Sequence, residues 1–423
     1  MTDAASSEAA PITKPALSMV EFVALMAMLS ATIAFSIDAM LPALPDIGAA
    51  LSPLNPNAAQ LVIVAFVFGM GAGTIFAGPM SDAFGRKRVM LSGAVLYCAG
   101  AVGAAFAPTL ETIIVARVIQ GLGAAGPRVA AQAMIRDLYM GRGMAKVASF
   151  VMMTFTLVPA MAPLIGSLII AGFGWRAVFW AFVVFSVISG GWLALRQPET
   201  LPLARRRPLR LRPLAAAFRE VLGHRNVRLA IFIQTMVFGL LFSTITSVQP
   251  IYQDVFDRAE SFPLWFGLVA LLSGGASFLN ARVVGRVGML WMLRRALAGH
   301  LVLSLMLALV WVAGLLSGES AFWAFFGFQV SSFALAGLTI GNLQAIAMQP
   351  MGHIAGMASS VISSMSTILA VAVAVPIGLA FDGTPVPLIV GSGLCAGVAF
   401  LMALALRDGS GALEEPFAGQ KLR

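Results

Sequence analysis

The chain has 423 residues, of which 59% are hydrophobic and 11% are charged. Soluble domains carry about 25% charged residues, so this composition excludes a soluble enzyme or a soluble nucleic-acid-binding domain. It indicates an integral membrane protein, in which the formal net charge of +9 needs an explanation other than a nucleic-acid partner.

Apolar runs long enough to cross a bilayer recur along the whole chain. A membrane-spanning helix needs about 20 mostly apolar residues. Residues 1–18 lack a basic n-region and a cleavage site, so we expect a tail and not a signal peptide. After it we predict twelve spans, at residues 19–45, 59–81, 89–107, 110–134, 146–171, 175–195, 229–253, 262–281, 294–316, 321–348, 354–380 and 386–406.

The positions of the basic residues predict the orientation, because Lys and Arg accumulate in cytoplasmic loops. We place both termini in the cytoplasm. All but four of the 27 basic residues then fall on the cytoplasmic side, the exceptions being Arg117, Arg128, Arg176 and Arg258. The excess of positive charge is therefore explained by topology.

The first span contains a single charged residue. Asp38 is the only charge in the 24 residues from Phe22 to Pro45. An ionisable group inside a span is costly, and it usually marks an ion, proton or substrate pathway. Because no other carboxylate lies well inside an apolar run, we expect Asp38 to carry the coupled proton.

The loop between the second and third spans, residues 78–89, reads "GPMSDAFGRKRV". It resembles the signature loop of the major facilitator superfamily, G-x-L-a-D-r-x-G-r-k. By that resemblance Asp82 contacts the start of the eleventh span and Arg86 pairs with Asp137, which together latch the cytoplasmic side when the transporter opens outward. The implied gating residues are Gly78, Asp82, Gly85, Arg86 and Asp137.

The fourth span contains two arginines. Residues 115–128, "VARVIQGLGAAGPR", resemble the superfamily's second motif, R-x-x-Q-G-x-g-a-a, from Arg117 to Ala125, with Gln120 as its glutamine. Arg128 follows Arg117 by 11 residues, about three helical turns, so both lie on nearly the same face. Asp38 and Arg117 both lie about 10 Å below the outer surface. We expect Asp38 to face Arg117 across a central cavity and, with Gln120 and Arg128, to take part in proton coupling; a fixed ion pair of Asp38 with Arg117 is the alternative.

The fifth span contains "VPAMAPLIGS", residues 158–167. It is similar to the antiporter motif G-P-x-x-G-G, with Pro163 and Gly166 matching and Pro159 preceding them. The resemblance implies antiport. Small residues and prolines permit close packing against a neighbour, for which we expect residues 273–277 of the eighth span.

The longest polar interruption, residues 196–228, carries nine arginines and no lysine. It divides the spans six and six. The predicted parts are the cytoplasmic tail 1–18, an N-terminal bundle 19–195, a cytoplasmic linker 196–228, a C-terminal bundle 229–407 and a cytoplasmic tail 408–423. The arginines are typical of a segment that meets anionic lipid head groups, and a regulatory role is the alternative.

The two halves repeat each other weakly, and Thr246 falls opposite Asp38, so the acid belongs to one half only. The cysteines and histidines show no metal-binding spacing, and we expect no cofactor and no metal. Polar residues in the second half are possible substrate contacts, although hydrogen bonding between helices would also explain them. They are Gln234, Thr246, Gln249, Gln329 and Asn342.

Taken in order over residues 35–180, these motifs resemble the Bcr/CflA group of bacterial drug and proton antiporters. The resemblance implies a major facilitator fold, with twelve helices in two six-helix bundles, acting as a monomer in the bacterial inner membrane. The implied function is proton-coupled efflux of small amphipathic drugs by alternating access.

Two other functions compete with this interpretation. One is transport of a native metabolite, such as a sugar or an amino acid, on the same fold. A membrane-embedded enzyme or sensor is disfavoured, because no nucleophile, base and orienting group can be assembled and no extramembrane segment is long enough for a second domain.

Overall fold

The computed structural model describes residues 16–209 and 211–406, and all regular secondary structure in this part of the chain is helical. Most of the predicted tails therefore lie outside the described residues. Two helices are short, α2 (Leu44–Leu51) and α8 (Leu211–Gly223). Twelve are long: α1 (Met19–Asp38), α3 (Leu61–Phe84), α4 (Arg86–Ala105), α5 (Leu110–Leu138), α6 (Gly141–Phe173), α7 (Ala177–Arg196), α9 (Arg225–Pro250), α10 (Phe262–Val287), α11 (Met289–Val312), α12 (Gly318–Met348), α13 (Ala355–Leu379) and α14 (Val386–Leu404).

Each long helix corresponds to one predicted span. Ten stretches of the described chain are long and apolar enough to cross a membrane. One of them, Gly318–Leu379, contains both α12 and α13, which meet at a kink at Met351. The apolar part of α6, Leu157–Phe173, is shorter than the others. The all-α membrane architecture is confirmed.

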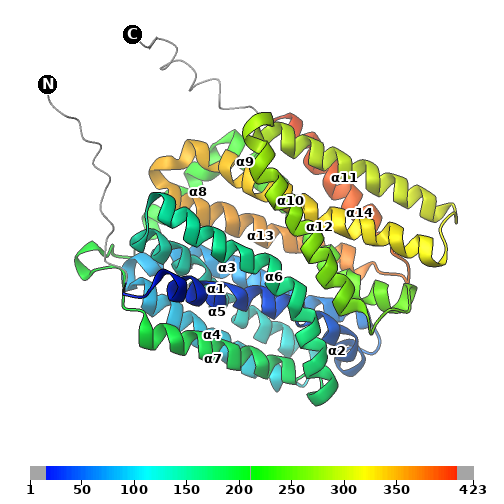
Figure 1. Ribbon diagram of the computed structural model, residues 1–423, viewed down its shortest axis with the longest axis horizontal. Coiled ribbons are helices and arrows are strands. Elements are labelled where there is room, and N and C mark those ends of the chain that lie inside the picture. Colours follow the sequence, from blue (N-terminus) through cyan, green and yellow to red (C-terminus); the bar gives the residue numbers. More distant parts are fainter. Residues whose placement is uncertain (1–15, 210, 407–423) are drawn as a thin grey trace, which may run out of the picture.

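The long helices form two bundles (Figure 1). Helices α1 and α3–α7 pack together, and α9–α14 form the second group. The bundles meet mainly where α3 lies against α13 and α6 lies against α10. One contact of this interface is the Ser364 hydroxyl, which donates to the Gly71 carbonyl at 2.5 Å. We call the side of the bundles that carries the linker the linker side, and the opposite side the far side.

The first span is interrupted, which corrects its prediction as one helix over residues 19–45. Helix α1 ends at Asp38, a short 3-10 turn follows at Leu41–Ala43, and α2 begins at Leu44. Pro42 lies in that turn. Proline has no N–H and disfavours helical geometry in the residue before it, so the helix must end upstream.

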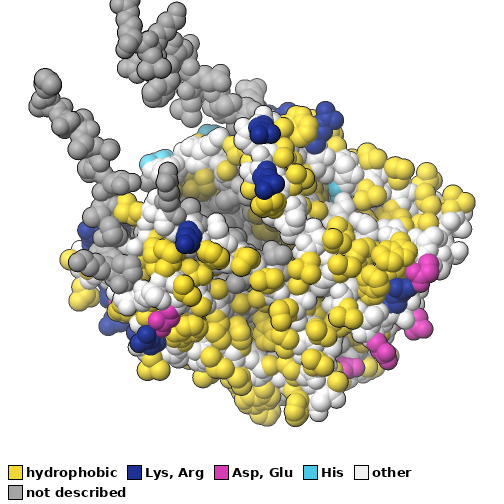
Figure 2. Space-filling view, in the orientation of Figure 1, with side chains coloured by type: hydrophobic (Ala, Val, Ile, Leu, Met, Phe, Trp, Pro, Cys, Tyr) yellow, Lys and Arg dark blue, Asp and Glu magenta, His cyan; other side chains and the backbone are white. Residues whose placement is uncertain are grey.

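The two sides of the interface differ. On the far side the bundles are tied together, since the Asn57 amide donates to the Phe381 carbonyl at 2.8 Å and the Gln60 amide donates to the Gly378 carbonyl at 3.1 Å. Toward the linker side, the surface is hollowed between α6 and α10 (Figure 2). The structure is therefore closed on the far side, and its linker side is hollowed between α6 and α10.

The linker contacts both bundles. Near its start, the Arg207 N–H donates to the Asp82 carbonyl at 3.1 Å, in the N-terminal bundle. Farther along, α8 lies against α9 and α13 and buries Leu214 in the core of the C-terminal bundle. Glu220 of α8 also pairs with His353, which precedes α13, at 2.7 Å.

Candidate functional site

Asp38 lies at the end of α1, where its side chain is buried. Its carboxylate has no hydrogen bond and no ion pair with any residue of the described chain. The expected ion pair with Arg117 is therefore absent from this structure. Asp38 is the one buried carboxylate in the described part that lacks a partner, because the other, Asp137, pairs with Arg86.

Arg117 is fully buried on α5 and is satisfied by neutral groups. Its guanidinium donates to the Ser36 carbonyl at 3.0 Å, to the Val62 carbonyl at 3.0 Å and to Gln120 Oε1 at 2.7 Å. It also lies over the Phe66 ring, 4.5 Å from the centroid. Arg117 and Gln120 thus hold α1, α3 and α5 together.

The interruption of α1 explains why Arg117 binds a carbonyl and not the acid. The last four carbonyls of a helix lack intrahelical donors, and the helix dipole makes that end attractive to a cation. Ser36 lies in the last turn of α1. Arg117 reaches α1 near the predicted depth. It bonds to the backbone carbonyl of Ser36, two residues before Asp38, and not to the Asp38 side chain.

The antiporter-like motif packs against the turn that follows Asp38. A Cβ added to Gly166 would lie 2.2 Å from the Ala39 carbonyl oxygen, so only glycine permits this approach of α6 to α1. The fifth span packs against the eighth as expected, because α6 lies against α10, and the close approach there is at Gly267, which meets the Ala160 carbonyl. Both prolines lie inside α6: Pro163 is between these two contacts and Pro159 directly precedes Ala160.

Arg128, on the same helix as Arg117, has different surroundings. Its side chain is half-buried, and it makes no hydrogen bond, ion pair or ring contact with the residues that the structure describes. Arg128 and Arg117 are thus both inside the N-terminal bundle, but only Arg117 is satisfied there.

The five polar residues of the second half are all buried, and the structure does not bring them into one open cavity. Gln329 accepts a hydrogen bond from Tyr252 at 2.9 Å. Asn342 donates to Asn280 at 2.9 Å, and Thr246 donates to a carbonyl of its own helix. Several of their polar atoms are buried without a partner among the described residues, namely Gln234 Oε1, Gln249 Oε1 and Gln329 Nε2.

The signature loop forms a charged cluster on the linker side. Arg86 Nε donates to Asp137 Oδ2 at 3.1 Å, which confirms the predicted pair, and Arg86 Nη1 bonds to Ser81 and Asp82. The Asp82 side chain is half exposed. It contacts Arg86 and not the start of α13, so the expected second half of the latch is not formed in this conformation.

Two glycines of this loop have the roles expected of them. Gly85 has φ +102°, which side chains rarely adopt, and it connects α3 to α4. A Cβ on Gly78 would lie 3.2 Å from the Ser360 hydroxyl of α13, so Gly78 lies where the two bundles touch.

Glu199 and Thr200, at the start of the linker, belong to this cluster and were missed by sequence reasoning. Glu199 accepts hydrogen bonds from the backbone N–H of Arg86 at 2.9 Å and of Lys87 at 3.2 Å, so it caps α4. The Thr200 hydroxyl donates to Asp137 Oδ2 at 3.0 Å. An acid directly after the sixth span, in a segment otherwise full of arginines, was the available signal.

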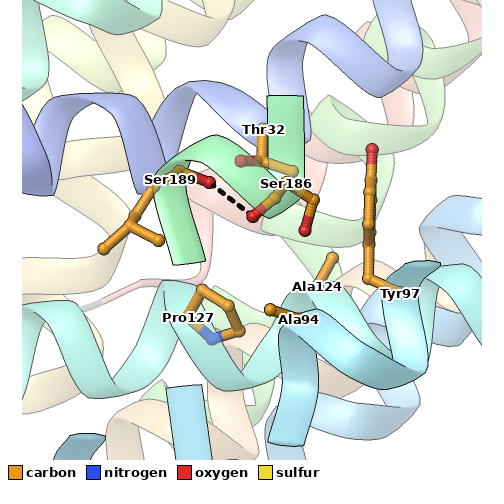
Figure 3. Close-up of a pocket in the computed structure, with 8 residues that line it drawn as sticks. Thr32, Ala94, Tyr97, Ala124, Pro127, Ser186 and Ser189 are labelled. Atoms are coloured by element: carbon orange, nitrogen blue, oxygen red, sulfur yellow. Dashed lines mark hydrogen bonds between the residues drawn. The ribbon is translucent and has the colours of Figure 1, made fainter. Parts of the chain in front are cut away.

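A small polar void lies inside the N-terminal bundle (Figure 3). Thr32, Tyr97, Ser186 and Ser189 contribute its polar lining, and its volume is about 10 Å³. That is room for about one water molecule and not for a drug. Tyr97 also bonds to Ser36 at 2.5 Å, next to the carbonyl that Arg117 holds.

No cluster of three or more potential metal ligands occurs within residues 16–209 and 211–406. A family model, described as "Major Facilitator Superfamily", matches residues 23–375. The chain belongs to the major facilitator superfamily. It is a membrane transporter and not an enzyme.

Relatives within the superfamily are named for drug resistance. The chain is 30% identical over 346 residues to a bicyclomycin resistance protein homolog of Haemophilus influenzae, covering 81% of this chain and 85% of the relative. It is 34% identical over 165 residues to a chloramphenicol resistance protein of Pseudomonas aeruginosa, covering 38% and 39%. These relatives place it in the Bcr/CflA-like drug efflux group.

Solved structures confirm the fold. A D-xylose-proton symporter matches with a TM-score of 0.72 at 14% identity, covering 92% of this chain and 98% of that one. A peptide transporter matches with a TM-score of 0.70 at 15% identity, covering 91% and 93%. At these identities the likeness concerns the fold alone.

Proposed function

We propose that this transporter exports small amphipathic drugs across the bacterial inner membrane in exchange for protons, by alternating access. The linker side is the cytoplasm, as the placement of basic residues predicts. The structure described above is then an inward-open state, in which a drug enters from the cytoplasm between α6 and α10. The drug-resistance names of the relatives support the substrate class.

Asp38 carries this proposal. It is a buried carboxylate without a partner, in the half of the chain that holds the antiporter-like motif. Removal from water disfavours the charged form of a carboxylate, whereas contact with water or a cation favours it. Closure on one side and opening on the other changes those surroundings, so Asp38 takes up a proton from outside and releases it inside.

A vesicle experiment tests the proposal. Purified full-length protein is reconstituted, a pH gradient is imposed, and uptake of chloramphenicol or bicyclomycin is measured together with proton movement. Asp38→Asn should abolish gradient-driven accumulation while the protein still inserts. Asp46→Asn is the matched control, because Asp46 lies eight residues later on α2 and is exposed. Accumulation by Asp38→Asn at the wild-type rate would refute the role of Asp38.

A native metabolite remains the second candidate substrate, and the same vesicles test it with a sugar or an amino acid in place of the drug. A hydrophilic molecule needs several polar groups that face one cavity. The five polar residues expected to supply them are all buried in this conformation, and two of them, Gln329 and Asn342, are hydrogen-bonded to other side chains. Hydrogen bonding between helices therefore accounts for part of this polar set.

A further inference from the structure

The direction of the Arg128 side chain follows from helix geometry. Val115 is 59% exposed and marks the lipid-facing side of α5. At 100° per residue, Arg128 points about 140° away from Val115 and only about 20° away from Arg117, which contacts α1. Arg128 therefore faces the interior of the molecule and not the lipid.

The Arg128 side chain is nevertheless not fully buried. It is half-buried, while Gln132 and Arg136, one and two helical turns closer to the linker side, are exposed. The three residues follow each other at intervals of four and so lie along one side of the helix. They form a polar path, which we call the Arg128 stripe, that leads from the bundle interior to the open linker side.

The Arg128 stripe has no counter-charge in the structure. None of its three side chains makes a hydrogen bond or an ion pair with a described residue. The neighbouring acids Asp82 and Asp137 are both engaged by Arg86. An arginine inside a membrane span requires a partner or a water-filled space, and at Arg128 the described chain supplies no partner.

We propose that Arg128 binds a negatively charged oxygen group of the transported molecule, which makes amphipathic organic anions, such as aromatic monocarboxylates, the preferred substrate class. The inference rests on the proposed function for the transport direction, but the binding itself does not depend on proton coupling. A guanidinium offers paired N–H donors that match a carboxylate in two parallel hydrogen bonds. A cationic drug would be repelled at this site.

The proposal has an electrical consequence. Exchange of one entering proton for one leaving monoanion moves two charges across the membrane, whereas a neutral drug moves one and a monocation none. A potential of 100 mV changes the equilibrium accumulation by about 50-fold for each charge that moves. A potential that is negative inside thus drives anion export strongly, even without a pH gradient.

Equilibrium binding tests the proposal independently of transport. Nalidixate, a heteroaromatic monocarboxylate, and its neutral carboxamide are titrated into the purified full-length protein at a pH at which nalidixate is ionised. Wild-type protein should bind nalidixate at least tenfold more tightly than the amide. Arg128→Gln should lose this preference and keep its affinity for the amide within about threefold, and Arg128→Lys should retain part of the preference.

Arg295→Gln is the matched control, because Arg295 is exposed on α11 and touches only the ring of Trp291. It should bind both compounds as the wild type does. Equal affinity of the wild type for nalidixate and the amide, or an unchanged preference in Arg128→Gln, would overturn the assignment. A wild-type protein that prefers nalidixate to the amide but shows no pH-driven transport would instead contradict the proposed proton coupling. The anion site would then still stand.

Discussion

Arg117 and Arg128 lie on one face of the same helix, yet they differ in burial and in hydrogen bonding. Arg117 is fully buried, with two carbonyls, one amide oxygen and an aromatic ring around it. Arg128 is half-buried and has no partner in the described chain. A membrane arginine is thus not functional by position alone. The neutral acceptors around Arg117 indicate a structural role, whereas no described partner neutralises the charge of Arg128.

Arg117→Ala should have the largest effect, because it breaks the contact of α5 with α1 and α3. It leaves two buried carbonyls and Gln120 Oε1 without a donor, each at about 1 to 3 kcal/mol. We expect little folded protein by size-exclusion chromatography after mild heating. Arg117→Lys keeps the charge but cannot reach all three acceptors, so its melting temperature should fall between those of Arg117→Ala and the wild type. Wild-type stability in both variants would contradict the structural role.

Arg86→Gln adds an intermediate case, since Arg86 is paired with two carboxylates, with the Ser81 hydroxyl as its one neutral side-chain acceptor. The change leaves the buried Asp137 without its cation, and breaking a buried pair costs about 3 kcal/mol or more. The loss should be smaller here than for Arg117, because Asp137 keeps the Thr200 hydroxyl.

A double-mutant cycle measures this pair. Adding Asp137→Asn to Arg86→Gln should restore part of the lost melting temperature, because no uncompensated charge then remains. Additive losses in the double variant would show that the two residues do not interact.

Gly166→Ala tests the support behind the Arg117 contact. The added Cβ would lie 2.2 Å from the Ala39 carbonyl oxygen and would push away the turn that follows α1. Overpacking of this kind costs about 1 to 3 kcal/mol. Gly172→Ala on the same helix is the control, because its Cβ would meet nothing within 4 Å. Equal melting temperatures for both variants would mean that α6 does not hold this turn in place.

Arg128→Gln should have the smallest effect on stability, although it removes a charge from the bundle interior. No described contact is lost, so the melting temperature should change by an amount equivalent to less than about 0.5 kcal/mol. The amount of Arg128→Gln protein inserted in the membrane should equal or exceed that of the wild type, since an arginine inside a span costs about 2.5 to 3.5 kcal/mol on insertion. A loss comparable to that of Arg117→Ala would erase the distinction between the two arginines.

The fold was predictable because a bilayer allows few solutions. Runs of about 20 apolar residues must be helices in a membrane, and each predicted span matches one long helix. The short helices were missed for a physical reason. Helix α2 continues an apolar run that Pro42 interrupts, and α8 is an amphipathic helix whose apolar residues, such as Leu214, bury against the C-terminal bundle. Hydropathy does not separate such pieces from a span or a loop.

The site was predictable where local spacing decides the contact. Arg86 and Asp137 pair as expected, and Gly85 has the backbone angle that its turn requires. The partner of Arg117 was not predictable, because it depends on where α1 ends and on which carbonyls that end exposes. Glu199 was missed because its partners are backbone groups, which leave no pattern in a sequence.

The linker limits how far the two bundles can separate. Arg207 is held at Asp82 of the N-terminal bundle, whereas α8, beginning at Leu211, is docked on the C-terminal bundle. Four residues of chain reach about 14 Å when fully extended. Any wider opening at this edge must first release Arg207 or detach α8. The segment thus works as a short tether of fixed maximum length, and lengthening it would enlarge the range of motion without altering a single residue of either bundle.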